Sequence, residues 1–129
     1  MKAKILLIED NEQNRYLLTF LLEQRGHEVV SAMSGSLGLE LAAKVSPDLI
    51  LLDIQLPGMD GYAVARALKS DPRFKSTPIV AVTSYAMVGD KEKVLAAGAE
   101  GYIEKPINPE TFVTEVERFL RLPGEEAIP

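Results

Sequence analysis

Five short apolar runs recur along the chain, separated by longer stretches in which apolar and polar residues are mixed. These runs predict β-strands at residues 4–8, 29–32, 49–52, 79–82 and 101–103. Three of the runs consist almost entirely of Ile, Leu and Val, whereas a strand with one exposed face would alternate apolar and polar residues. The pattern therefore predicts parallel strands that are covered on both faces.

The stretches between the strands have the spacing of amphipathic helices. Residues 14–25 place leucines on one face, and Leu37, Leu41 and Val45 follow one another at intervals of four. A repeated strand-helix order implies right-handed crossovers and helices on both faces of the sheet. The predicted fold class is therefore α/β, a doubly wound, flavodoxin-like (βα)5 architecture with five parallel strands in the order 2-1-3-4-5.

The last predicted helix has recognisable boundary signals. Asn108 is predicted to be its N-cap and Pro109 its first residue. Its apolar face consists of Phe112, Val116, Phe119 and Leu120. The helix is expected to end near Leu122, before a Pro-Gly pair. We therefore expect one domain over residues 1–122 and a C-terminal tail over 123–129, with no attached effector domain.

Composition restricts the class of protein further. The 129 residues suffice for one domain with its own core, and no apolar run approaches the roughly 18 residues of a membrane span. The N-terminus lacks a signal-peptide pattern, and the absence of cysteine excludes disulfides and thiolate chemistry, so we expect a cytoplasmic protein. A net charge of −5 and a pI near 4.9 argue against an electrostatic interaction with nucleic acid.

Polar and charged residues follow directly after the predicted strands. The first strand is followed by Glu9 and Asp10, the third by Asp53, the fourth by Thr83 and the fifth by a segment that contains Lys105. Ligands of open parallel sheets bind beyond the carboxyl ends of the strands. The sequence therefore predicts that three carboxylates, a hydroxyl and an ammonium group meet at one edge of the sheet.

Three carboxylates in one cleft require a counter-charge. Two unit charges about 4 Å apart repel by roughly 4 kcal/mol at an effective dielectric constant of 20. The available ligands are oxygen atoms, from Glu9, Asp10, Asp53 and the backbone carbonyl of Gln55, while the chain has no cysteine and a single histidine, His27. Such ligands favour Mg²⁺, which keeps several waters and is shared with a phosphate, and they disfavour zinc.

The remaining groups suit phosphoryl transfer. The Asp53 carboxylate can attack phosphorus as a nucleophile if a metal ion and a lysine neutralise the phosphoryl oxygens. Lys105 is predicted to pair with Asp53 in the unmodified protein and with a phosphoryl oxygen after transfer. The hydroxyl of Thr83 is placed to donate a hydrogen bond to that added group. The predicted product is an aspartyl phosphate.

Simpler interpretations exist for each of these residues taken alone. Acidic residues at strand ends are often solvated turn formers, and Lys105 with its proline could be only a turn. Thr83 could be an ordinary strand residue of high β-propensity, and Tyr102 a half-buried strand aromatic. His27 is interpreted as structural, in the turn before the second strand. The combination of residues, not any single one, favours a functional site.

In combination these motifs resemble the receiver domain of two-component response regulators, from residue 3 to about residue 122. The residues that carry the resemblance are Ile-Glu-Asp-Asn at 8–11, Leu-Leu-Asp-Ile-Gln-Leu-Pro-Gly-Met-Asp-Gly at 51–61, Val-Thr-Ser-Tyr-Ala at 82–86, Tyr102 and Lys105-Pro106. In that family the Lys-Pro peptide bond is usually cis. The local sequence in these segments is most similar to stand-alone receivers of the DivK type and to receivers of hybrid kinases.

The resemblance implies a function for the matching positions. Asp53 accepts a phosphoryl group, Glu9 and Asp10 hold Mg²⁺, and Thr83 and Tyr102 form the switch. The donor is a phosphohistidine on a sensor histidine kinase or a histidine phosphotransfer protein. The output is binding to another protein through the face formed by the fourth helix, the fifth strand and the fifth helix. The chain is expected to be a monomer or a phosphorylation-dependent dimer. No nucleic acid or membrane partner is expected. The chain would then be a signalling switch that catalyses only its own phosphorylation and dephosphorylation, and not an enzyme.

The match also has departures and alternatives. Ser84 stands where alanine is more frequent, and Gln55 and Tyr85 occupy positions that influence the lifetime of the phosphoryl group in the family. A receiver excised from a hybrid histidine kinase is one alternative. A flavodoxin-like binding protein, or a hydrolase of the same topology, is another, although Glu9 and Asp10 would repel a bound phosphate unless a metal ion intervened. A receiver that binds its partners without phosphorylation is a third, but such a protein would usually have lost Asp53, Lys105 or the acidic pair.

Overall fold

The computed structural model describes residues 2–56, 60–84 and 90–120. Five parallel strands form one sheet in the order β2-β1-β3-β4-β5. They are β1 Lys4–Ile8, β2 Glu28–Ala32, β3 Leu49–Asp53, β4 Ile79–Thr83 and β5 Gly101–Glu104. The predicted strands differ from these by one residue at most, and the predicted fold class and strand order are confirmed.

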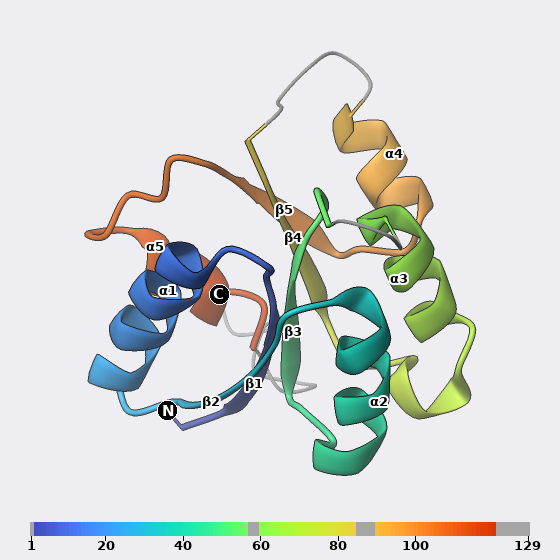
Figure 1. The fold of residues 1–129 in the computed structure, drawn as a ribbon, viewed down its shortest axis with the longest axis horizontal. Helices are drawn as coiled ribbons and strands as arrows, with labels where there is room; N and C mark the ends of the chain where they lie inside the picture. Colours follow the sequence, from blue (N-terminus) through green and yellow to red (C-terminus); the bar gives the residue numbers. More distant parts are fainter. Residues whose placement is uncertain (1, 57–59, 85–89, 121–129) are drawn as a thin grey trace, which may run out of the picture.

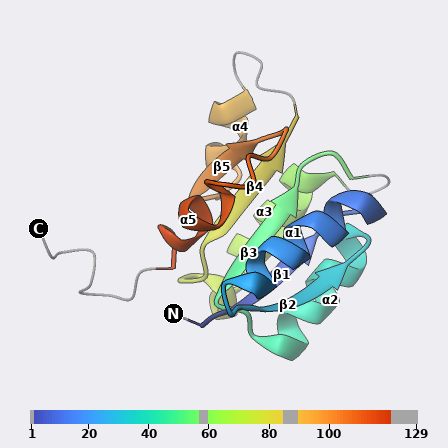
Figure 2. The same ribbon diagram turned by 90° about the vertical axis from the view of Figure 1, so that its left-hand side faces the viewer.

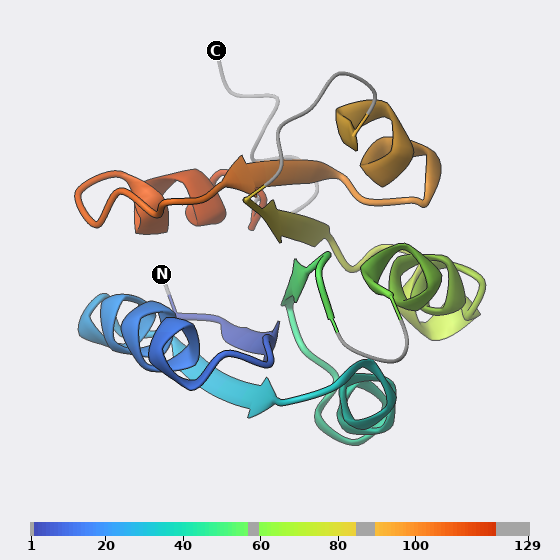
Figure 3. The ribbon, with the colours of Figure 1, turned by 45° about the horizontal axis from the view of Figure 1, so that its top comes forward.

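Helices cover both faces of the sheet. They are α1 Glu12–Gln24, α2 Gly35–Val45, α3 Gly61–Lys69, α4 Asp90–Ala96 and α5 Phe112–Glu117, with a short 3₁₀ helix at Pro72–Phe74. Figures 1 and 3 show α1 and α5 on one side of the sheet and α2, α3 and α4 on the other. In Figure 2 the side with α1 and α5 faces the viewer. None of the helices in the described ranges is both long enough and apolar enough to span a membrane.

The two helical layers explain why the central strands are apolar throughout. Every residue of β3 and β4 is buried. Alternate side chains of one strand point to opposite faces, so Ile50 and Leu52 join the core under α2, α3 and α4, whereas Leu49 and Leu51 join the core under α1 and α5. The nearly unbroken apolar runs are therefore the result of two cores that share one sheet.

The boundaries predicted for the last helix are wrong at both ends. The helix begins at Phe112 with Thr111 as its N-cap, not at Pro109 with Asn108. Asn108 instead forms a turn ahead of the helix: its side chain accepts a hydrogen bond from the backbone NH of Glu110, and its carbonyl accepts from the NH of Thr111. Asparagine side chains compete with helical hydrogen bonding in this way, which delays the first helical turn.

The end of α5 at Glu117 also precedes the predicted one near Leu122. The NH groups of Phe119 and Leu120 donate to carbonyls three residues earlier, not four. The chain after Glu117 therefore has the tighter hydrogen bonding of a 3₁₀ turn and not that of an α-helix. Both side chains nevertheless pack against the core under α1 and α5, as their spacing predicted. Residue 122 and the predicted tail at 123–129 lie outside the described residues, and the domain limits stay a prediction.

His27 has a structural role, as expected from its place before β2. The side chain is buried, with Nδ1 accepting a hydrogen bond from the backbone NH of Ala3 at 3.1 Å and Nε2 2.8 Å from Glu117 Oε2. Because Nδ1 is the acceptor, the proton of the neutral ring is on Nε2 and is donated to Glu117. The contact joins the start of β1 to the end of α5, far from the carboxyl ends of the strands.

Candidate functional site

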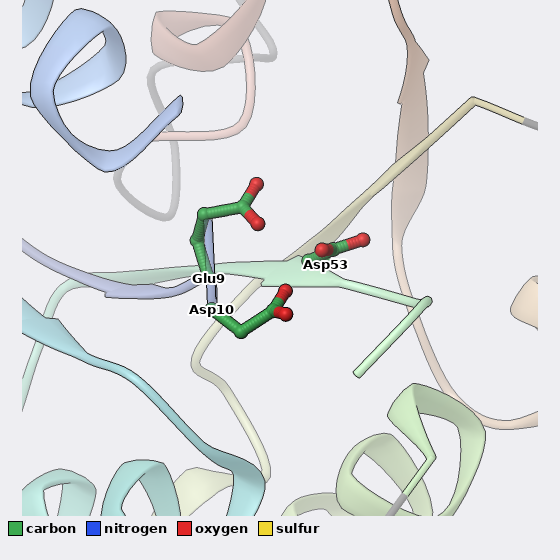
Figure 4. A group of neighbouring side chains, drawn as sticks. All are labelled: Glu9, Asp10 and Asp53. Atoms are coloured by element: carbon green, nitrogen blue, oxygen red, sulfur yellow. The ribbon is translucent and has the colours of Figure 1, made fainter. Parts of the chain in front are cut away.

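The register of the parallel strands brings the predicted acidic residues together. Ile8 of β1 lies opposite Leu52 of β3. The residues that come next, Glu9 directly after β1 and Asp53 at the end of β3, are therefore neighbours. The side chain of Asp10 follows from the same turn. Oxygen atoms of Glu9, Asp10 and Asp53 all lie within 4.8 Å of one another. Figure 4 shows the three carboxylates near one another at the carboxyl ends of β1 and β3.

Two of the three carboxylates are buried, with exposed fractions of 1% for Glu9 and 4% for Asp53, and Asp10 is exposed. One oxygen of Glu9 accepts a hydrogen bond from the backbone NH of Asn11 at 3.1 Å. One oxygen of Asp53 accepts from the backbone NH of Gln55 at 3.0 Å. These short-range hydrogen bonds orient the two buried groups, while the side of the cluster formed by Asp10 stays open to solvent.

Lys105 reaches this cluster from the end of β5. Its Nζ lies 3.1 Å from Glu9 Oε1 and 3.6 Å from Asp53 Oδ2. The predicted pairing with Asp53 is present, and the shorter contact to Glu9 was not anticipated. The Lys105-Pro106 peptide bond is cis, and the NH of Lys105 donates to the carbonyl of Thr83. Lys105 is thus held beside β4 with its ammonium group on two carboxylates.

The end of β4 contributes a residue with a hydroxyl group, Thr83, to the site. Val82 is the register partner of Asp53, so Thr83 is the next residue along, and it is buried at 5% exposure. Ser84 donates a hydrogen bond to Gln55 Oε1 at 2.7 Å, which bridges the segments that follow β3 and β4. The structure therefore brings Thr83 to the predicted edge of the sheet. The role of Thr83 in phosphoryl binding stays a prediction. The role of the Gln55 carbonyl as a metal ligand also stays a prediction.

Tyr102 is half-buried on β5 and packs against the core under α2, α3 and α4. Lys91 of α4 places its Nζ 5.6 Å from the centre of the Tyr102 ring. Both the strand interpretation and a switch role are compatible with this position. Tyr85, the other aromatic residue singled out in the sequence, lies outside the described residues.

Burial and mutual repulsion change the acidity of the cluster. The pKa of Glu9 is raised from 4.5 to about 7, chiefly because the carboxyl group is buried, and further because it shares a hydrogen bond with Asp53 and feels its charge. The NH of Asn11 and the charge of Lys105 act in the opposite direction but do not compensate. Without a metal ion, Glu9 is therefore protonated in about half of the molecules near pH 7. A divalent cation in the cluster would favour the charged form of Glu9.

This raised pKa predicts a pH-dependent stability of the metal-free protein. Between pH about 4.5 and 7 the folded state binds more protons at Glu9 than the unfolded state, so the free energy of unfolding falls as pH rises. A shift of this size corresponds to a loss of up to about 3 kcal/mol. Urea unfolding in EDTA at pH about 5 and about 8, for wild type and Glu9→Gln, measures the effect. The wild type should lose stability relative to the variant, and equal losses in the two proteins would contradict the assignment.

Sequence reasoning missed Arg15, in the first turns of α1. Its Nη1 donates to the carbonyl of Glu9 at 3.0 Å and to the carbonyl of Asp10 at 2.9 Å. An arginine one turn beyond the N-cap Asn11 was the only available signal. That signal does not distinguish an arginine that turns back over the preceding loop from one that extends into solvent.

Comparisons with known proteins agree with this geometry. The family profile of the response regulator receiver domain matches residues 5–117. The polar-differentiation response regulator DivK of Brucella ovis is 41% identical over 120 residues, which are 93% of this chain and 98% of that protein. The chemotaxis response regulator CheY4 of Vibrio cholerae superposes with a TM-score of 0.88 at 32% identity, covering 93% of this chain and 100% of that one.

A third relative bears on the acidic cluster. The receiver domain of a Pseudomonas aeruginosa sensor histidine kinase superposes with a TM-score of 0.85 at 31% identity, covering 93% of this chain and 98% of that one. Its structure is described as having a magnesium ion coordinated in the active site cleft.

Proposed function

Because the chain belongs to the family of response regulator receiver domains, we propose that it is a phosphorylation switch that accepts a phosphoryl group on Asp53 with the help of Mg²⁺. The observation that supports this most directly is the cluster itself. Three carboxylates at the carboxyl ends of two adjacent strands lie within 4.8 Å of one another, and a lysine that follows a third strand contacts two of them. A site that served only to stabilise the fold would have no reason to gather this much like charge.

The donor set fits Mg²⁺. All candidate ligands are oxygen atoms, from Glu9, Asp10, Asp53 and the carbonyl of Gln55, and the exposed side at Asp10 leaves room for waters and a phosphate. The magnesium ion described in the related kinase receiver supports the same choice. When bound, Mg²⁺ would neutralise the charge on the oxygens of the phosphoryl group during transfer.

Transfer itself requires a nucleophile and a charge clamp from the chain. A carboxylate oxygen of Asp53 forms a bond to phosphorus while the bond between phosphorus and the donor histidine nitrogen breaks, and the released imidazole takes up a proton from water. The NH of Gln55 holds the Asp53 carboxylate in place. Lys105, already on the cluster, binds a phosphoryl oxygen and stabilises the charge that develops there.

The product then alters the surface around it. A phosphoryl group adds a charge of about −1.5 to −2 and new acceptor oxygens, which can draw in the hydroxyl of Thr83 and allow Tyr102 to turn inward. The affected face consists of α4, β5 and α5. We propose that a sensor histidine kinase or a histidine phosphotransfer protein supplies the phosphoryl group and that another protein binds this face. The cytoplasmic location and the monomeric or dimeric state stay predictions.

The proposal is tested by mass spectrometry of the intact protein after incubation with acetyl phosphate. With Mg²⁺ we expect a gain of about one phosphoryl mass, and in EDTA no gain, because the bare carboxylates repel the anionic donor. Mg²⁺ binding without any mass gain would favour a receiver that works without phosphorylation. Release of inorganic phosphate on every turnover with no retained group would favour a hydrolase.

A further inference from the structure

The turn that carries Glu9 and Asp10 is held by a residue outside the acidic cluster. Arg15 donates two hydrogen bonds from a single nitrogen, Nη1, to the carbonyl oxygens of Glu9 and Asp10. Hydrogen bonds from a charged donor are about twice as strong as neutral ones. Both peptide carbonyls therefore point toward α1, which sets the direction in which the two side chains leave the turn.

The three carboxylates differ in how much they depend on this support. Glu9 is oriented by Asn11 and Lys105, and Asp53 is oriented by Gln55 and Lys105. The Asp10 carboxylate is exposed and makes no hydrogen bond or ion pair with any residue in the described ranges. No other side chain holds it, so the backbone of the turn is the support that places the Asp10 side chain beside the other two carboxylates.

We propose that Arg15 is a positioning residue for the metal site, which fixes the Glu9-Asp10 turn so that Asp10 is ready to bind Mg²⁺ with the other two carboxylates. This inference rests on the proposed function, because it assumes that the cluster holds Mg²⁺. Groups that orient metal ligands from behind typically change metal affinity by 10–100-fold when they are removed.

The charge of Arg15 makes the inference sharply testable. By simple electrostatics, removal of a cation near an acidic cleft should strengthen the binding of Mg²⁺. Loss of the Arg15 hydrogen bonds should weaken Mg²⁺ binding, because the ion would then also have to order the turn and the Asp10 side chain. The two effects have opposite signs, so the direction of the change distinguishes them.

The experiment is calorimetric titration of the full chain with MgCl₂, for wild type, Arg15→Gln and Arg15→Lys. We expect Arg15→Gln to bind Mg²⁺ about 10-fold more weakly. Because both hydrogen bonds come from one nitrogen, a lysine ammonium should serve the same carbonyls and recover part of the affinity. The matched control is Arg66→Gln, an exposed arginine of α3 with no ion pair among the described residues, which should bind as the wild type does.

Thermal unfolding in EDTA, measured on the same variants, separates positioning from a purely structural role. A structural role predicts a lower melting temperature with an unchanged Kd for Mg²⁺. If Arg15→Gln binds Mg²⁺ as tightly as the wild type or more tightly, the inference is wrong while the proposed function stands. If the wild type itself binds no Mg²⁺, the proposed metal site fails, and the inference fails with it.

Discussion

Asp53→Asn is expected to abolish the Mg²⁺-dependent gain of a phosphoryl group from acetyl phosphate. An amide is a far weaker nucleophile toward phosphorus than a carboxylate, and the substitution also removes one of the three carboxylates that could hold a metal ion. We expect the rate of phosphorylation to fall by at least about 10³-fold. Intact-protein mass spectrometry over a time course, with and without Mg²⁺, measures this directly.

The fold should survive the change, so that a loss of phosphorylation has a chemical cause. Asparagine has nearly the same shape, and its Oδ1 can still accept the hydrogen bond from Gln55. The matched control is Asp60→Asn, which makes the same chemical change at the exposed N-cap of α3, where asparagine caps as well as aspartate. Asp60→Asn should be phosphorylated normally. A mass gain that persists in Asp53→Asn would show that another residue is the acceptor.

Gly61→Ala is expected to cause the largest loss of stability of any single methyl addition at the site. A Cβ at Gly61 would lie 2.4 Å from the Cα of Ile54 and 2.8 Å from the carbonyl oxygen of Asp53. Both are backbone atoms, so relief of the clash requires movement of the backbone segment at Asp53 and Ile54. We expect a loss of about 2–4 kcal/mol in the free energy of unfolding. Urea unfolding at constant pH measures it.

Gly38→Ala provides the comparison. A Cβ at Gly38 would approach three side-chain atoms of Ile8, with Cγ1 at 2.8 Å and Cγ2 at 3.2 Å in addition to the closer Cδ1. Ile8 is fully buried, but a side chain can repack more easily than a backbone segment can move. Inside a helix, alanine is more stable than glycine by about 1 kcal/mol, and this gain offsets part of the strain in α2. We therefore expect Gly38→Ala to cost less than Gly61→Ala, about 2 kcal/mol or less. Equal losses at the two positions would contradict the distinction between backbone and side-chain contacts.

Local patterns predicted most of the fold, because each strand is a short apolar run and each helix has its own periodicity. Prediction failed where local signals competed with one another. Asn108 and Pro109 have the composition of a helix start, yet Asn108 forms a turn with Glu110 and the helix begins at Phe112. Which hydrogen bond an asparagine side chain makes depends on backbone energies that a residue pattern does not contain.

The sequence by itself determined which chemical groups reach the edge of the sheet. Glu9, Asp53, Thr83 and Lys105 each follow an apolar run, and parallel strands deliver their carboxyl ends to the same edge. This is why the acidic cluster could be predicted from the sequence alone. The family resemblance then supplied the roles of these residues.

Only the tertiary structure decided how these groups pair. The contact between Lys105 and Glu9 joins residues 96 positions apart and is shorter than the contact with Asp53. The raised pKa of Glu9 follows from its burial beside Asp53, and the hold of Arg15 on the acidic turn follows from a side chain that folds back over the loop. Each depends on distances of a few ångströms between separate elements, which are set by how the helices and strands pack and are not encoded in the spacing of residues along the chain.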